Sequence, residues 1–197
     1  MTTRQGKLRT GFTTGTAAAA ATKGALKCLL EKKCPEWVAV QLLNGQTLRI
    51  PIHTCEKVND RSAVCTVIKD AGDDPDVTNG AEIGAQVSLL ANPTARTAAG
   101  SVIIKGGRGV GRVTKPGLEV PPGEPAINSG PRRMIAQAAR EIMQKHAIDQ
   151  PVQVDVFVPA GEELALKTLN ARLGILGGIS ILGTTGVVTP MSHAAYK

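Results

Sequence analysis

Apolar positions recur at helical spacing in two long stretches of the chain. The first, Thr16 to Lys33, is rich in alanine, which has the highest helix propensity of the amino acids. Thr16 suits the N-cap, and the two lysines at the other end suit the negative end of the helix dipole. The second, Pro131 to His146, repeats apolar residues at i, i+1, i+4, i+5 and i+8, with its proline in the first turn. The pattern predicts two long helices and a short one over Gly161 to Thr168.

Apolar runs of strand length fill most of the chain between these helices. Asn44-Gly45 separates two of them, and this dipeptide between apolar runs is a strong signal for a β-hairpin. The predicted strands are Trp37 to Leu43, Gln46 to Ile52, Ser62 to Ile68, Ile83 to Leu90, Ser101 to Ile104 and Val152 to Val158. Together with the helices they predict an α/β (α+β) fold, a mixed β-sheet domain with flanking helices.

Two glycine-rich stretches break the pattern. Gly106 to Gly130 is longer than most loops of compact domains, and loops of that length are usually functional or disordered. Recurring apolar anchors argue against disorder: Val110, Val113, Leu118, Val120 and Ile127. Gly174 to Pro190 is the second stretch. Neither stretch predicts a dinucleotide site, because GGRGVG is followed by a loop and the second stretch lacks G-x-G-x-x-G.

The segment Lys69 to Gly80, KDAGDDPDVTNG, follows directly after a predicted strand and contains four aspartates: Asp70, Asp73, Asp74 and Asp76. It has neither helical nor strand periodicity, and it contains the turn residues glycine and proline. Such a loop is either a solvated turn held by aspartate side chains or a chemical site. It lacks the distal glutamate of an EF-hand, which argues against a calcium site. Composition alone leaves turn and site open.

Composition and charge limit the partners. The net charge of +7 favours an anionic partner, and 2% aromatic residues argue against single-stranded nucleic acid, which needs stacking platforms. The N-terminus shows no apolar run of leader length, so no membrane and a cytoplasmic location are expected. The four cysteines form no Cys-x-x-Cys pair and no ligand ladder with histidine. They predict buried free thiols, neither a zinc site nor a redox motif, and no protein-bound metal.

The residues RTGFTTGT precede the first helix. Backbone N–H groups at a helix start form an anion site, and threonine hydroxyls add donors, so Thr13, Thr14, Gly15 and Thr16 are candidate binding residues. A capped turn is the alternative, since small polar residues are common at helix starts.

Four separated motifs occur in order and together resemble the CbiD family, the cobalt-precorrin-5B C1-methyltransferases. They are TGFTTGTAAAA, the aspartate loop, VTKPGLEVPPGEPAIN, and KTLNARLGILGGISILGTTGVVTPMS near the end. The likeness covers about Leu8 to Ala195 and makes residues 1–197 one CbiD-like domain. The resemblance implies methylation of C1 of cobalt-precorrin-5B by S-adenosylmethionine, giving cobalt-precorrin-6A in anaerobic vitamin B12 biosynthesis. It also implies the start of a Rossmann-like part near the C-terminus.

The resemblance suggests roles for the candidate residues. Carboxylates near a sulfonium hold cationic groups or act as a base, so Asp70, Asp73, Asp74 and Asp76 are the catalytic candidates, and crowding is expected to raise their pKa values. We expect Asp74→Asn to lower methylation without unfolding the protein. Cofactor-binding candidates are Thr13, Thr14, Gly15, Thr16, Gly177, Gly178, Gly183 and Thr184. An anionic tetrapyrrole needs basic forks, and the substrate-binding candidates are Arg108, Arg112, Lys115, Asn128, Arg132 and Arg133.

The chain departs from the family pattern at several positions. The family usually has Cys at Ala17, Asn-Pro-Val-Pro-Arg at Asn128 to Arg132, and Asn-Pro-Arg where this chain has Asn170, Ala171 and Arg172. Members also usually continue for well over a hundred residues beyond Lys197, so a fragment and a short form are both open. A non-catalytic tetrapyrrole-binding module and a phosphate- or nucleotide-binding enzyme are the alternative functions. The sequence leaves the oligomeric state and contacts with other pathway enzymes open.

Overall fold

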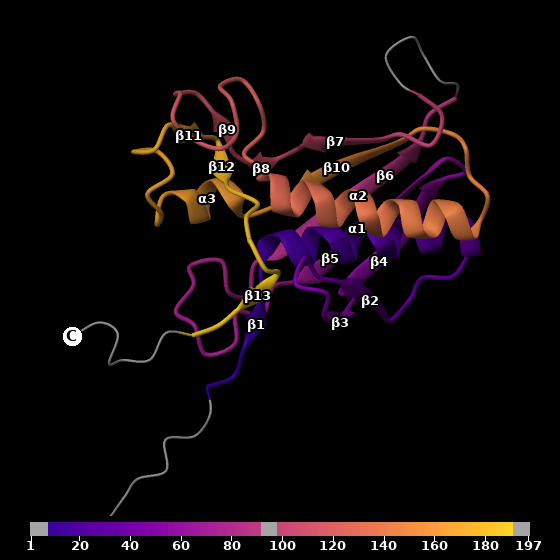
Figure 1. The fold of residues 1–197 in the computed structure, drawn as a ribbon, viewed down its shortest axis with the longest axis horizontal. Helices are drawn as coiled ribbons and strands as arrows, with labels where there is room; N and C mark the ends of the chain where they lie inside the picture. Colours follow the sequence, from indigo (N-terminus) through magenta and orange to yellow (C-terminus); the bar gives the residue numbers. More distant parts are fainter. Residues whose placement is uncertain (1–7, 92–97, 191–197) are drawn as a thin grey trace, which may run out of the picture.

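A five-stranded mixed sheet lies at the centre of the computed structural model, which describes residues 8–91 and 98–190 (Figure 1). Its strand order is β4 (Thr54–Asn59), β5 (Ser62–Ile68), β6 (Glu82–Leu89), β10 (Val152–Phe157) and β7 (Val102–Gly106). Neighbours are antiparallel except β10 and β7, which are parallel. The α/β prediction with a mixed sheet is confirmed.

Helices α1 (Thr14–Glu31) and α2 (Ser129–Lys145) lie side by side against one face of the sheet (Figure 1). Five consecutive alanines of α1, residues 17–21, are fully buried. Small side chains are needed there because α1 contacts α2, the sheet and the β2 strand at once. None of the helices in the described part of the chain is long and apolar enough to cross a bilayer.

The predicted bounds of the first helix were wrong at both ends. The N-cap is Thr13, whose hydroxyl oxygen accepts a hydrogen bond from the Thr16 N–H at 3.2 Å. At the other end the helix stops at Glu31, and Lys32 adopts a left-handed conformation with φ of 55°. The hairpin is confirmed as β2 (Trp37–Gln41) and β3 (Thr47–Pro51), with Gly45 at φ of 84°. Strand β4 was missed because most of its residues are exposed and show no alternation.

The two glycine-rich stretches pair with each other to form a lobe beside the sheet (Figure 1). Strands β8 (Gly109–Val110) and β9 (Arg112–Val113) come from the first stretch, and β11 (Ile175–Leu176) and β12 (Gly178–Ile179) from the second. The lobe also contains α3 (Gly161–Ala165), shorter than predicted. Four of its predicted anchors are buried in the main core or in a second small cluster around Val113, and the fifth, Leu118, is partly buried against that cluster. Because these strands have two residues each, the start of a Rossmann-like part is not confirmed.

Strand β1 (Gly11–Phe12) pairs antiparallel with β13 (Val187–Val188), which joins the beginning and the end of the described chain. This pair lies beside the start of α1 (Figure 1).

The cysteine prediction was wrong in two respects. Cys55 and Cys65 face each other across β4 and β5 and form a disulfide. Of the two free cysteines, Cys28 is buried as predicted, whereas Cys34 is exposed. Burial and the hydrogen bond with Cys34 raise the pKa of the Cys28 thiol to about 12, so this thiol is neutral at neutral pH.

Candidate functional site

A pocket of about 310 Å³ lies where the start of α1, the aspartate loop and the last glycine-rich stretch meet. Its volume is at the lower end of the range for small-molecule sites, and its wall combines apolar side chains with a few polar groups, as such sites do. The lining residues are Thr13, Thr14, Lys69, Asp76, Val77, Thr78, Thr168, Asn170, Ile179, Ser180, Leu182 and Val188.

The charged pair of this pocket is Lys69 with Asp76. The Lys69 side chain is 1% exposed, and its Nζ lies 2.7 Å from Oδ2 of Asp76, whose side chain is 28% exposed. A buried ammonium needs a charged partner because burial without one is very costly. Asp76 therefore neutralises Lys69 on one side and reaches the pocket on the other.

The hydrogen bonds of Asp76 keep it ionised. Its Oδ1 accepts from the Thr78 N–H at 2.7 Å and from the Thr78 hydroxyl at 2.6 Å. Burial raises the pKa of Asp76, but the bonds from Lys69 and Thr78 outweigh burial and hold the pKa below its ordinary value. Asp76 is thus suited to holding a cation, and it is a poor proton acceptor at neutral pH.

Asp70 and Asp73 hold the fold of the loop. Asp70 pairs with the Arg9 guanidinium and accepts from the Gly72 N–H at 2.8 Å, and these two bonds lower its pKa. Asp73 accepts from the Arg9 N–H at 2.6 Å. The expectation that crowding raises the pKa values was wrong for Asp70 and Asp76, because each has hydrogen-bond donors of its own. Asp74 does not line the pocket, so the geometry favours Asp76 over Asp74 as the functional residue.

The predicted anion site at the start of α1 is largely filled by the chain itself. The Gly15 N–H donates to the Leu182 carbonyl at 3.1 Å, and the Thr16 hydroxyl donates to the Gly186 carbonyl at 2.7 Å. Thr14 exchanges two hydrogen bonds with the backbone of Leu182. Only Thr13 and Thr14 of the four candidates line the pocket. These contacts argue against a phosphate site here, and they show how the first and last motifs are joined.

The glycine candidates differ in the space around them, which protein atoms fill at Gly178 and Gly183 but not at Gly177. A Cβ on Gly178 would lie 2.2 Å from the Gly109 carbonyl oxygen, and one on Gly183 would lie 2.4 Å from the Thr13 hydroxyl oxygen. Gly177 has a φ of 78° and open space around it. Thr184 lines a separate hollow of about 100 Å³ with Asn128 and Gly183. None of these four residues lines the main pocket.

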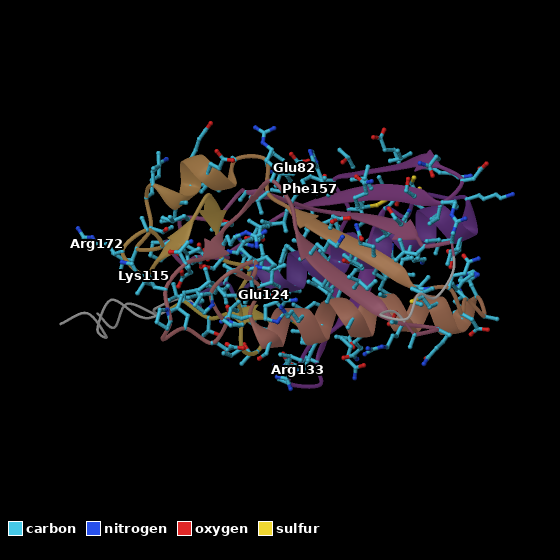
Figure 2. The ribbon with its side chains drawn as sticks, turned by 90° about the horizontal axis from the view of Figure 1, so that it is seen from above. Glu82, Lys115, Glu124, Arg133, Phe157 and Arg172 are labelled. Carbon is cyan, nitrogen blue, oxygen red and sulfur yellow. A yellow bond between two sulfur atoms is a disulfide. The ribbon has the colours of Figure 1, made fainter. Side chains whose placement is uncertain are left out.

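The basic candidates separate into two groups. Arg132 and Arg133 line an open groove of about 890 Å³ along α2, together with Arg140. Arg108, Arg112 and Lys115 belong to the lobe, and the Arg112 guanidinium donates to the Gly123 carbonyl. Figure 2 shows this separation, with Lys115 on the lobe and Arg133 beside α2. The basic substrate-binding candidates therefore lie on two separate surfaces.

Glutamates offset the cations at the start of α2. Glu119 accepts from the Ser129 N–H at 2.7 Å and from the Asn128 amide at 2.9 Å, and Glu124 lies 3.7 Å from Arg132. Asn128, a substrate-binding candidate, is the N-cap of α2 and therefore has a structural role at the start of this helix.

Sequence reasoning missed several lining residues, above all Lys69 and Asn170. Lys69 directly follows strand β5, and a lysine there has no sequence pattern that separates it from a surface lysine. Asn170 lies in the last motif, and its Nδ2 donates to the Gly178 carbonyl at 3.1 Å. Position inside a family motif was the signal that could have identified it.

The stability of the fold is expected to fall in acid. The folded-state pKa values of Asp70 and Asp76 are lowered, so their stabilisation is full above the unfolded pKa of about 4 and is lost as pH falls through the folded pKa. Urea unfolding at about pH 7 and about pH 3 tests this. The fall in the free energy of unfolding between the two pH values should be smaller for Asp76→Asn, which lacks one of the two carboxylates. A free energy of unfolding that is equal or higher at the lower pH would contradict it.

Comparison with known proteins gives a consistent result. The family model described as CbiD matches residues 1–190. The cobalt-precorrin-5B C(1)-methyltransferase of Geotalea daltonii is 49% identical over 96% of this chain and 51% of its own length, and that of Desulfitobacterium hafniense is 51% identical over 96% and 46%. The crystal structure of the cobalamin biosynthesis protein cbiD from Archaeoglobus fulgidus has a TM-score of 0.71 at 33% identity, covering 98% of this chain and 58% of that one. The chain spans about half the length of the curated relatives it matches.

Proposed function

The chain belongs to the CbiD family, and we propose that it acts in the methylation of C1 of cobalt-precorrin-5B to cobalt-precorrin-6A, with S-adenosylmethionine as methyl donor. The observation that carries this proposal is the convergence of three motifs on one pocket. Thr13 comes from the first motif, Asp76 from the aspartate loop and Asn170 from the last motif. Residues so distant in sequence form a single cavity, as a small-molecule site requires.

The pocket wall fits a cationic cosubstrate. S-adenosylmethionine supplies a methyl group already activated on a sulfonium and carries an ammonium group. Asp76 supplies an ionised carboxylate for a cationic group, and Lys69 fixes the orientation of that carboxylate. Thr13 and Thr14 add further polar groups to the wall, whereas Ile179 and Leu182 add apolar surface that excludes water. Alignment and charge are the main needs of a displacement at an activated methyl group.

The tetrapyrrole substrate is proposed to contact the groove along α2. Its acetate and propionate groups are ionised at neutral pH, and Arg–carboxylate pairs are strong and geometrically specific. Arg133 is the best-placed candidate because it lines both the α2 groove and the small hollow with Thr184. The lobe cations Arg108, Arg112 and Lys115 form a second candidate surface. The cytoplasmic location stays a prediction from the sequence.

Titration calorimetry with S-adenosylmethionine tests the cosubstrate site. We expect the intact, folded chain to bind it, and Asp76→Asn to weaken binding by about 10- to 100-fold, because a hydrogen bond to a charged group contributes about 1.5–3 kcal/mol. Asp74→Asn is the matched control in the same loop, and its affinity should equal that of the unsubstituted chain.

Two results would overturn this assignment. Absence of binding to folded protein would exclude the methyltransferase function for this chain, and retained binding of a cobalt tetrapyrrole would then favour the non-catalytic module. Equal losses in Asp74→Asn and Asp76→Asn would show that the pocket does not hold the cosubstrate.

A further inference from the structure

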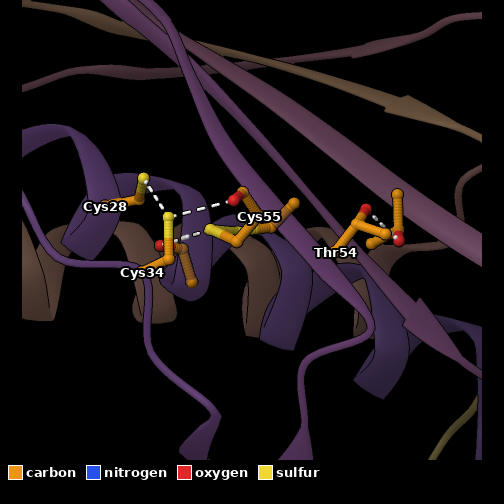
Figure 3. Close-up of a disulfide and its surroundings, with 7 residues drawn as sticks. Cys28, Cys34, Thr54 and Cys55 are labelled. Atoms are coloured by element: carbon orange, nitrogen blue, oxygen red, sulfur yellow. Dashed lines mark hydrogen bonds between the residues drawn. A yellow bond between two sulfur atoms is a disulfide. The ribbon is translucent and has the colours of Figure 1, made fainter.

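Three sulfur atoms meet at the end of α1 that is opposite the pocket. Cys28 lies in the last turns of α1, Cys34 in the segment that follows, and Cys55 on β4. Their Sγ atoms all lie within 4.8 Å of one another (Figure 3). Cys28 follows Thr14 of the pocket by 14 residues, so the helix places this cluster about 21 Å from the pocket at about 1.5 Å per residue. The cluster is therefore independent of the proposed methyl-transfer site.

Hydrogen bonds and the disulfide hold these three sulfur atoms in place. The Sγ atoms of Cys28 and Cys34 are 2.8 Å apart, and the Cys34 thiol donates to the Cys55 carbonyl at 3.0 Å. Cys55 is bonded to Cys65, which is fully buried between α1 and the sheet. Cys28 is buried, Cys55 is partly buried and Cys34 is exposed, so one side of the cluster is open to solvent.

This arrangement has the chemistry of a thiolate metal site. Thiolates bind zinc at about 2.3 Å, which sets the sulfur atoms of a tetrahedral site about 3.8 Å apart. Here the Cys28 and Cys34 sulfur atoms are closer than that, at 2.8 Å, and all three sulfur atoms lie within 4.8 Å of one another. No sequence pattern predicted this cluster, because Cys28 and Cys34 do not have Cys-x-x-Cys spacing and only the fold brings Cys55 to them.

We propose that Cys28, Cys34 and Cys55 bind one Zn²⁺ ion once the Cys55–Cys65 disulfide is reduced. The fourth position, on the open side next to Cys34, takes a water molecule. Reduction breaks the S–S bond and requires two electrons and two protons. Two reductant thiols supply both and become a disulfide, whereas a phosphine supplies the electrons, takes oxygen from water to become a phosphine oxide, and leaves the two protons of that water to the cysteines. The metal then displaces one proton from each of the three thiols. The disulfide and the metal exclude each other, because the Cys55 sulfur takes part in both.

Cys65 and Cys55 provide a matched pair of variants. Each alanine substitution removes the disulfide, but only Cys55→Ala removes a ligand. The measurement is zinc competition against a chromophoric chelator, after phosphine reduction and without it, and Co²⁺ substitution followed by its thiolate charge-transfer absorption. Circular dichroism and thermal unfolding establish that each variant is folded.

We expect one zinc per chain after reduction and none in the disulfide form. Cys65→Ala should bind one zinc without any reductant, whereas Cys55→Ala and Cys28→Ala should bind at least about 10-fold more weakly even when reduced. Folded, reduced protein without zinc binding would overturn the proposal. So would equal binding, or equal loss of binding, in Cys65→Ala and Cys55→Ala. Cobalt spectra without thiolate charge-transfer bands would also overturn it.

Discussion

Replacing Asp76 by alanine is expected to lower the free energy of unfolding by about 3 kcal/mol, the lower end of the cost of breaking a buried ion pair. The change leaves the Lys69 ammonium, 1% exposed, without its carboxylate. It also removes the acceptor of the Thr78 N–H and hydroxyl, which fold the second half of the loop. Urea or thermal unfolding measures the loss.

Asp74→Ala is the control for this prediction. It changes the same residue type two positions away, and among the described residues no hydrogen bond reaches its carboxylate, so a change within about 0.5 kcal/mol is expected. Adding Lys69→Met to Asp76→Ala should recover stability, because the unpaired buried charge is then absent. A double-mutant cycle should give a coupling of about 2 kcal/mol. Equal effects of Asp74→Ala and Asp76→Ala would show that the ion pair does not stabilise the loop.

Gly178→Ala is expected to destabilise the protein by about 3 kcal/mol, at the upper end of typical overpacking costs. Its new Cβ would lie 2.2 Å from the Gly109 carbonyl oxygen, and that atom belongs to the backbone of the paired strand β8. Strand β12 would have to move, and it carries Ile179 into the pocket wall. Both the stability of this variant and its affinity for S-adenosylmethionine should therefore fall.

The neighbouring Gly177→Ala is the matched comparison. Its Cβ would meet open space, and the cost of a left-handed alanine at φ of 78° is about 1 kcal/mol. Binding is expected to be unchanged in this variant. If Gly177→Ala lost binding while remaining almost as stable as the unsubstituted chain, the result would instead support the prediction from sequence that Gly177 binds the cosubstrate. Equal stability of the two variants would contradict the packing argument.

The local sequence pattern was sufficient to predict several of the helices and strands. The alanine run predicted α1, the Asn44-Gly45 pair predicted the β2–β3 hairpin, and the apolar run from Ser62 predicted β5 with its correct bounds. These features depend on propensity, periodicity and turn chemistry, which act between neighbours in sequence. Four ordered motifs were also sufficient to identify the family, because family membership is a property of the sequence itself.

Tertiary structure alone decided which residues lie together. It selected Asp76 from four similar aspartates by pairing it with buried Lys69, and it used the threonines at the start of α1 to hold a segment 168 residues away. It also brought Cys55 to Cys28 and Cys34, although Cys55 lies 21 residues beyond Cys34 in the sequence. The physical reason is the same in each case: charge pairing, hydrogen bonding and metal coordination depend on distances of a few ångströms in space, and sequence separation does not set those distances.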